Sequence, residues 1–258
     1  MIVARLLIAA KNFLRVRHAV RHRAVLAAAA AFMWGLSSLF LVNAAPAPQA
    51  SKTQSSTKTP DLSGLWFFHG DDIRANFDYG PSSPPLPWAQ EQLKANQSKL
   101  NSVLYCYPVG VPRIWTQPYP FEFIVLPNRV LIYYEFQHTV RQIFMDGREH
   151  PKDLIPTYMG HSTGKWEGDT LVIDTVGFND KTWLDNTKRP LSDALHVTER
   201  IRRPSHDVLE VAFTVDDPKG YAKPWTVKRV FDLKPDWEIS EHVCEDNNTY
   251  LFPNGNPK

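Results

Sequence analysis

The chain has 258 residues, of which 43% are hydrophobic, 12% aromatic and 22% charged, with 21 prolines, 12 glycines and 2 cysteines. This composition excludes a disordered chain, a collagen-like fibre and a disulfide-dense miniature scaffold, and it supplies enough apolar residues for a hydrophobic core. The net charge of +2 averages two unlike parts, because residues 1–44 carry six basic and no acidic side chains. The remainder is mildly acidic, so we expect no nucleic-acid partner, since phosphate binding needs a basic stripe.

The first 44 residues have the pattern of an export signal. Basic residues precede an apolar run at 24–42, and Val42 and Ala44 are small residues at the positions that precede signal cleavage. The apolar run approaches the length that spans ~30 Å of hydrocarbon, so an uncleaved membrane anchor is the alternative. Residues 45–60 are small, polar and punctuated by proline, which predicts a disordered linker. Both alternatives place a single domain, residues 61–258, in the periplasm or outside the cell, with a membrane contact only through an uncleaved anchor.

The two cysteines fit this location. Cys106 and Cys244 lie far apart in the sequence, in a compartment where disulfides persist. An even number of cysteines in an exported chain predicts a disulfide between them. Two unbridged, buried thiols are the alternative.

Short apolar or alternating runs, separated by turn residues, follow one another along most of the domain. β-Branched and aromatic residues dominate ten such runs, which we predict to be strands: 64–68, 121–126, 129–136, 138–145, 159–166, 170–178, 195–203, 208–215, 225–233 and 237–244. One short helix is predicted over 88–100, after two prolines. No helical pattern separates consecutive strands, which argues against a parallel βαβ sheet. We therefore predict an all-β fold, an antiparallel meander of about 8–10 strands that closes into a lipocalin-like barrel, because closure leaves no exposed edge; a β-sandwich is the alternative.

Three strands each place one charged residue on an otherwise apolar face. These residues are Glu199, Arg229 and Glu241, and Asp174 is a weaker fourth member because both faces of its strand are apolar. A buried charge costs several kcal/mol unless it is paired, so we expect Glu199, Arg229 and Glu241 to meet one another. Such a cluster either fixes the register of the barrel or anchors a polar group of a ligand, and these two interpretations remain open.

Aromatic residues also gather upstream, at 105–108 and 112–120, where prolines keep the chain extended and out of a central strand. Such a segment is either a lid over the mouth of the barrel or a plug that fills one end, and we favour the plug.

The sequence gives no sign of a metal or a cofactor, and we expect neither. It has no HExxH, CxxC or phosphate-binding loop, and the ligand-type residues around His242 and Cys244 lack the spacing of zinc sites. Residues 160–164 match the G-x-S-x-G pattern of a nucleophile elbow. That motif needs a helix after the serine, and a strand is predicted there instead, so the match is attributed to chance.

Several motifs resemble those of a large, mostly uncharacterised family of exported bacterial proteins. They are 85–88 (PLPW), 164–175 (GKWEGDTLVIDT), 182–185 (TWLD), 197–200 (VTER), and 216–218 (DDP) followed by 223–225 (KPW). Members of that family often have a histidine where this chain has Leu191. The opening Gly64-Leu65-Trp66 is similar to the G-x-W start of lipocalin-type barrels, in which the tryptophan caps one end. These resemblances imply export and a β-rich fold, and they lend no catalytic residue.

Three functional hypotheses follow. The first is an exported, lipocalin-like protein that binds a small apolar or amphipathic molecule inside the barrel, through Glu199, Arg229 and Glu241 together with the aromatic residues Tyr134, Phe213, Trp225, Phe231 and Trp237. The second is a cofactor-free lyase, isomerase or hydrolase with Glu199, Glu241 or Asp174 as general acid or base. The third is an interaction module of the cell envelope with a packed core and an exposed aromatic patch around Trp115 and Tyr119.

Overall fold

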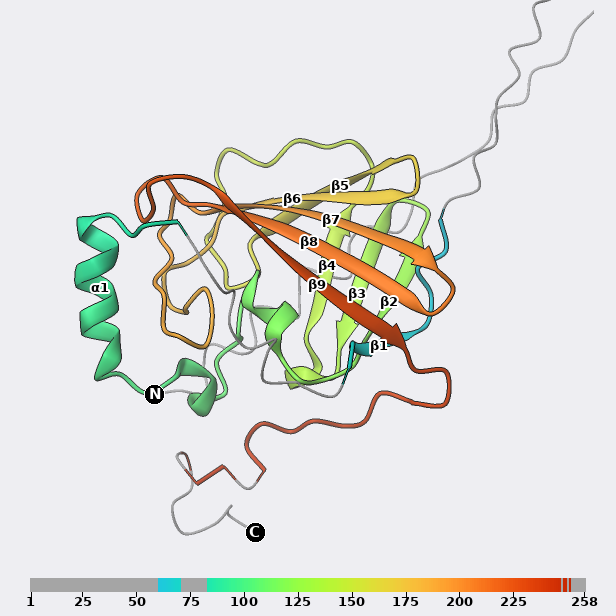
Figure 1. Cartoon of the computed structure of the whole chain (residues 1–258), viewed down its shortest axis with the longest axis horizontal. Coiled ribbons are helices and arrows are strands. Elements are labelled where there is room, and N and C mark those ends of the chain that lie inside the picture. Colours follow the sequence, from blue (N-terminus) through green and yellow to red (C-terminus); the bar gives the residue numbers. More distant parts are fainter. Residues whose placement is uncertain (1–59, 71–82, 247, 250, 252–258) are drawn as a thin grey trace, which may run out of the picture. The chain divides into compact units, whose positions relative to one another are not determined.

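The strands of the domain form one closed barrel in the order β1 to β9 (Figure 1). The computed structural model describes residues 60–70, 83–246, 248, 249 and 251, so the predicted signal or anchor (1–44) and all of the predicted linker except Pro60 lie outside the described residues. The strands are β1 (Leu65–Phe68), β2 (Phe121–Leu126), β3 (Arg129–Tyr134), β4 (Val140–Phe144), β5 (His161–Glu167), β6 (Thr170–Val176), β7 (His196–Ser205), β8 (Val208–Asp216) and β9 (Trp225–Leu233).

Neighbouring strands pair antiparallel at every step except one. β1 pairs with both β2 and β9, which closes the barrel and confirms the predicted all-β barrel over the sandwich. β4 and β5 pair parallel, through Ile143 with Ser162 and Phe144 with Thr163. The chain does not form a hairpin after β4. It crosses over through residues 145–160 and enters β5 in the same direction, so the predicted antiparallel meander is wrong at this one connection.

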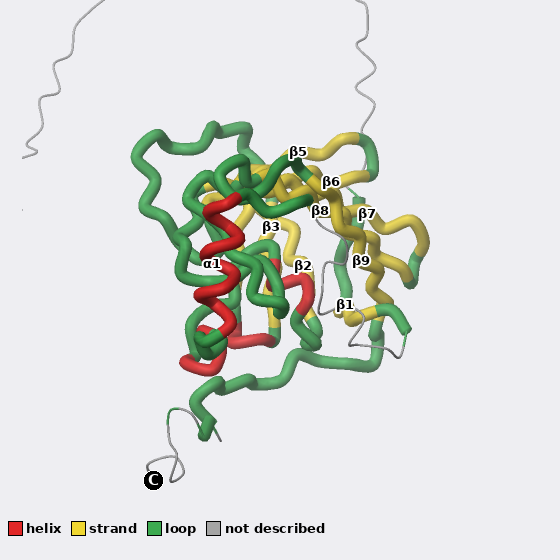
Figure 2. Tube along the Cα trace, turned by 60° about the vertical axis from the view of Figure 1, so that its left-hand side comes forward, coloured by secondary structure: helices red, strands yellow, loops and turns green. Residues whose placement is uncertain are grey.

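The helical segments lie beside the strands. The predicted helix is confirmed as α1 (Pro87–Gln97), which begins with a proline, as favoured for a first helical turn. Three single-turn 3₁₀ helices follow: η2 (Ser102–Tyr105), η3 (Arg113–Thr116) and η4 (Phe136–His138). Figure 2 shows α1 packed alongside the barrel, outside the ring of strands. None of the helices in the described part of the chain is long and apolar enough to cross a membrane.

The core follows the alternation of the strands. In β8, Leu209, Val211, Phe213 and Val215 are buried and the residues between them are half-buried. Trp66, which the G-x-W pattern predicted to cap one end, is fully buried. Its indole N–H donates to the carbonyl oxygen of residue 62 at 3.0 Å, and the Arg203 guanidinium lies 4.9 Å from the centre of its ring.

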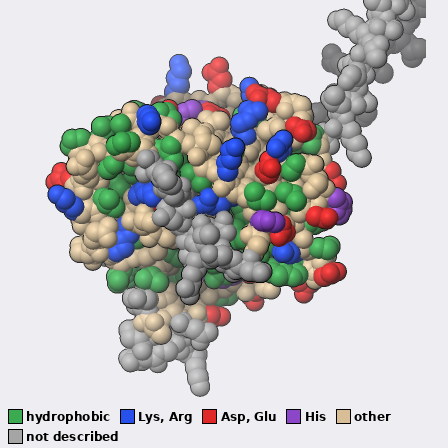
Figure 3. All heavy atoms as spheres, viewed as in Figure 1, with side chains coloured by type: hydrophobic (Ala, Val, Ile, Leu, Met, Phe, Trp, Pro, Cys, Tyr) green, Lys and Arg blue, Asp and Glu red, His purple; other side chains and the backbone are tan. Residues whose placement is uncertain are grey.

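The outer surface of β7 to β9 carries charges of both signs. Figure 3 shows Lys and Arg side chains interspersed with Asp and Glu side chains on this face. Nη1 of Arg200 lies 2.9 Å from Oε2 of Glu167, and Nε of Arg202 lies 2.7 Å from Oε2 of Glu210. Exposed ion pairs of this kind contribute roughly 0–1 kcal/mol each, so they add little to the stability of the barrel.

No strand forms at 237–244, contrary to the prediction. β9 already pairs with β1, so the closed barrel has no edge for a further strand to join. Trp237 is 50% exposed and Glu241 is exposed. The predicted disulfide is confirmed, and Cys106 and Cys244 hold this segment against the chain before β2, with Cα atoms 5.6 Å apart.

Breaking this disulfide will destabilise the protein. The bond joins residues 138 positions apart, and the loss of chain entropy for a loop of this length corresponds to at most about 5 kcal/mol of unfolding free energy. Urea unfolding with and without dithiothreitol measures the difference, and the double variant Cys106→Ser, Cys244→Ser should reproduce the reduced form. An unfolding midpoint that does not move on reduction would contradict this expectation.

Candidate functional site

A bidentate ion pair lies inside the barrel. Arg141 on β4 and Glu199 on β7 are 2% and 0% exposed. Nη1 of Arg141 donates to Oε1 of Glu199 at 2.8 Å, and its Nη2 donates to Oε2. The same Nη2 also donates to the hydroxyls of Ser162 at 3.2 Å and Thr175 at 3.0 Å. Every nitrogen of the Arg141 guanidinium and both oxygens of Glu199 thus have side-chain partners, which is what makes two buried charges tolerable.

Trp115 completes this interior site. It belongs to η3, in the proline-rich segment that we predicted to plug the barrel, and it is 1% exposed. Its indole N–H donates to Oε1 of Glu199 at 2.6 Å. Its ring packs against Phe121 and Phe231, with centroids 5.2 and 5.9 Å away. The plug is confirmed, and the exposed aromatic patch expected around Trp115 and Tyr119 is wrong, because Trp115 is buried and Tyr119 half-buried.

Burial and the ion pair together set the charge states of Tyr134 and Arg141. Burial raises the pKa of Tyr134, and the Glu199 carboxylate adds to that rise while Arg141 opposes it, so Tyr134 is neutral at physiological pH. Burial by itself lowers the pKa of Arg141, but the adjacent Glu199 outweighs burial and raises it. Arg141 therefore stays charged.

The predicted partners of Glu199 lie elsewhere. Arg229 on β9 is half-buried, and its Nη1 donates to the carbonyl oxygen of residue 228 at 2.8 Å. Glu241 is exposed, because its segment follows the closed barrel instead of joining it. The expectation that Glu199, Arg229 and Glu241 form one cluster is thus wrong, and Arg141 takes the place of both partners.

Sequence reasoning missed Arg141 because its strand gives no clear alternation. Arg141 shares a face with Ile143 and Met145, whereas Gln142 shares the other face with Val140 and Phe144. Each face thus holds one polar and two apolar residues. The strand pattern alone did not decide which face is buried, and the structure buries the face of Arg141 and Ile143.

The aromatic residues predicted to line the interior divide into two groups. Tyr134, Phe213 and Phe231 are buried there as expected. Trp225 is half-buried and packs against the Tyr221 ring, with centroids 4.8 Å apart. The prediction for Trp237 is wrong, because this side chain is exposed and packs against the Phe67 ring outside the barrel. Protein side chains therefore occupy the space beside Glu199 that we expected to hold a ligand.

Asp174, the weaker catalytic candidate, lies on the outer face of β6. It is separated from the interior site because its neighbour Thr175 points inward. Oδ2 of Asp174 accepts from Nε2 of His150 at 3.0 Å, and Oδ1 accepts from Nε2 of His196. Partial burial acts to raise the pKa of Asp174, but the hydrogen bonds from His196 and His150 lower it below its usual value. Asp174 is therefore an ionised acceptor shared by two imidazoles.

Ser162 of the G-x-S-x-G match is the second residue of β5 and pairs with both β4 and β6. It is 2% exposed, and its hydroxyl contacts Arg141 and Thr175. A buried serine on a strand has none of the exposure that a nucleophile elbow requires, which agrees with a chance match.

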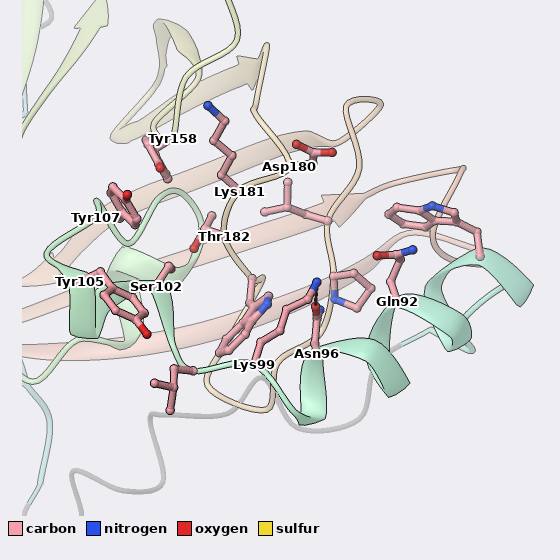
Figure 4. A pocket seen from close by; sticks show the side chains of 15 residues that line it. Gln92, Asn96, Lys99, Ser102, Tyr105, Tyr107, Tyr158, Asp180, Lys181 and Thr182 are labelled. Carbon is pink, nitrogen blue, oxygen red and sulfur yellow. Dashed lines mark hydrogen bonds between the residues drawn. The ribbon is translucent and has the colours of Figure 1, made fainter. Parts of the chain in front are cut away.

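A groove lies outside the barrel, on the side of α1. Its volume is about 630 Å³, and further surface hollows range from about 560 to 360 Å³. Its walls come from α1, from η2 and the residues after it, from the chain just before β5, and from the loop at 180–191 (Figure 4). No sequence pattern indicated this groove, because its walls come from segments distant in the sequence.

Aromatic and polar side chains are mixed along the groove. Tyr107 and Tyr158 present nearly parallel rings with centroids 6.4 Å apart, and Tyr107 is 53% exposed. Lys99 and Lys181 lie on opposite sides in Figure 4, and both are exposed. The hydroxyl of Ser102 is buried and has no hydrogen-bond partner among the described residues. A cavity of this size with aromatic walls and a few polar groups has the character of a small-molecule site.

Comparison with protein-family models gives no match, and comparison with curated proteins gives none either. The resemblance to exported bacterial proteins therefore stays a prediction. Function is inferred from the geometry of this chain alone.

Replacing Glu199 with glutamine should destabilise the protein strongly. Glu199→Gln leaves the Arg141 charge buried without its counter-charge, a loss of about 3–5 kcal/mol of unfolding free energy. The matched control Glu241→Gln changes an exposed side chain and should alter stability by less than about 0.5 kcal/mol. Urea unfolding at neutral pH measures both, and similar effects of the two substitutions would refute the assigned pair.

Proposed function

We propose that this chain is an exported binding protein for a small amphipathic molecule, which it holds in the groove beside α1. The sequence favoured a ligand inside the barrel. The groove is the better location, because Trp115 and Arg141 already occupy Glu199, with two hydrogen bonds to Oε1 and one to Oε2. A ligand in the interior would have to displace a buried indole and break a bidentate ion pair.

The mixture of groups in the groove supports the choice of ligand. The exposed ring of Tyr107, with Tyr158 close by, offers an apolar surface on which a flat or hydrocarbon part of a ligand can pack. The ammonium groups of Lys99 and Lys181 favour an anionic or carbonyl end. The exposed ring of Tyr107 beside Tyr158 is the single observation that carries most weight, because it offers an uncovered aromatic surface in a groove of ligand size. The hydroxyl of Ser102 adds a polar group to the same wall.

Export is supported by two independent features. The basic and apolar segments at 1–42 have the order of an export signal, and the disulfide between Cys106 and Cys244 is of a kind that persists in oxidising compartments. Both agree with a periplasmic or secreted protein, or with one anchored to the cytoplasmic membrane with its barrel outside.

The intact mass of the protein from its own cell envelope separates these two forms. Cleavage after Ala44 gives a chain that begins at Ala45, because signal peptidase removes the basic and apolar segments together. We expect that shorter mass. The mass of the full chain in the membrane fraction would establish the anchored form, and full-length protein in the cytoplasm would contradict export.

Binding in the groove can be tested with an anionic aromatic probe, 8-anilinonaphthalene-1-sulfonate. We expect its fluorescence to rise on binding, and we expect Lys181→Ala to weaken binding by about tenfold, since a hydrogen bond to a charged group contributes about 1.5 kcal/mol or more. Tyr107→Ala should weaken it as well. Both side chains are exposed, so neither substitution should affect folding.

Lys152→Ala is the matched control, because Lys152 is exposed and lines neither the groove nor the other four hollows. The uncharged probe N-phenyl-1-naphthylamine should bind wild type more weakly and be insensitive to Lys181→Ala. Probe binding that is unchanged by Lys181→Ala and Tyr107→Ala would reject the groove. Once binding is established, native mass spectrometry of protein from its own envelope identifies the natural ligand.

A further inference from the structure

Two imidazole nitrogens point at each other on the outer face of the barrel. His161 begins β5, and His150 comes from the crossover between β4 and β5. Their Nδ1 atoms are 2.7 Å apart, and the rings are close to perpendicular, with an interplanar angle of 75°. This is the distance of a hydrogen bond in which one Nδ1–H donates to the lone pair of the other Nδ1, and a metal ion bound by both nitrogens would replace that hydrogen.

The protonation of His150 follows from its other nitrogen. Nε2 of His150 lies 3.0 Å from Oδ2 of Asp174, and an ionised carboxylate can only accept, so Nε2 carries the proton. In the neutral ring Nδ1 is then a lone pair, directed at His161. The carboxylate therefore fixes the tautomer of His150 that has a ligating nitrogen available.

This arrangement is that of a metal-binding histidine with its supporting carboxylate. Metal-bound histidines commonly donate their second N–H to a carboxylate, which orients the ring and raises its basicity. Two imidazoles bound to one ion, with metal–nitrogen bonds near 2.05 Å, hold their nitrogens about 2.9 to 3.4 Å apart in square or tetrahedral geometry. The 2.7 Å separation of His150 and His161 needs to open by only a few tenths of an ångström.

The surroundings are compatible with a cation. Asp174 supplies a negative charge next to His150. The Phe144 ring stacks on His161 with centroids 5.2 Å apart and limits its rotation. The Arg148 guanidinium lies 3.9 Å from the centre of the Phe144 ring, and its Nε donates to Oδ1 of Asp146 at 2.8 Å. Burial, His150 and Arg148 each lower the pKa of His161, which keeps this imidazole neutral and able to ligate a metal ion.

The geometry points to a two-histidine site for a divalent transition metal, formed by Nδ1 of His150 and Nδ1 of His161. Among the described residues no group of three or more His, Cys, Asp or Glu side chains is arranged to hold a metal ion, so water completes the coordination. Imidazole ligands suit Cu²⁺, Ni²⁺ and Zn²⁺, and Cu²⁺ should bind most tightly of the three. Both cysteines are held in the disulfide and do not compete.

Metal titration of the full-length protein tests this site. We expect one Zn²⁺ per chain by calorimetry, and for Cu²⁺ a pulsed electron paramagnetic resonance signal from two coordinated imidazoles. His150→Ala and His161→Ala should each abolish the stoichiometric event. Asp174→Asn should weaken it by about 10–100-fold, because it removes the carboxylate that orients His150.

His196→Ala is the matched control. His196 also donates to Asp174 but does not contact the proposed ligand nitrogens, so its loss should leave the affinity within the error of the titration. His150 lies in a connection between strands, so His150→Ala stays informative even where His161→Ala disturbs β5; far-UV circular dichroism checks folding. Absence of stoichiometric binding by wild type, or binding that survives His150→Ala, overturns the site. So does an equal loss in His196→Ala, because it would place the ion on the other side of Asp174.

Discussion

The ion pair of Arg141 and Glu199 is the constraint on which the barrel depends. Taking two charges out of water costs several kcal/mol per ion, and only a closely matched set of partners offsets that cost. The partners come from β4, β5, β6, β7 and η3, so the pair is satisfied only when all five segments occupy their places. Replacing both charges with apolar residues need not lower stability, but leaving either one alone does. The pair thus specifies which strands meet across the barrel.

This constraint also decides where a ligand can bind. Trp115 joins the pair from a proline-stiffened segment, and its ring fills the space between Phe121 and Phe231. Interiors are packed to a density at which small voids already cost free energy, so a filled barrel of this kind is a scaffold. The groove proposed for the ligand lies instead outside the ring of strands, where α1 and the loop at 180–191 approach each other.

The sequence predicted the barrel well because alternation, turn residues and closure are local or topological rules. It placed all nine strands of the described residues, α1, the disulfide and the buried position of Glu199, and it added a tenth strand that does not form. It failed at 237–244, where the alternation of Trp237, Ile239 and Val243 is typical of a strand, because pairing of β1 with β9 is a long-range event that leaves no edge. It failed to find Arg141 because both faces of β4 are mixed. The groove and the histidine pair were beyond its reach, since both depend on where crossover segments are laid against distant strands.

Glu199 and Asp174 lie close together in the sheet but point to opposite faces of it, and this decides which of the two carboxylates is accessible. Glu199 on β7 lies opposite Ile173 on β6, and both point inward. Asp174 is the next residue on β6, so it points outward, where it meets imidazoles instead of a guanidinium. The inner carboxylate is sealed by its partners, whereas the outer one is half-exposed and can act on its neighbours.

The crossover at 145–160 supplies those neighbours and part of the groove as well. It is the connection that makes β5 parallel to β4, whereas the other neighbouring strands pair antiparallel. Because it must travel along the outside of the barrel, it brings His150 against Asp174 and His161, and it ends at Tyr158 on the wall of the groove. In a closed ring of nine strands at least one pair of neighbours is parallel, and this crossover makes β4 and β5 that pair. The crossover thus supplies one histidine of the proposed metal site and one wall of the groove, whose other walls come from the connections before β2 and β7.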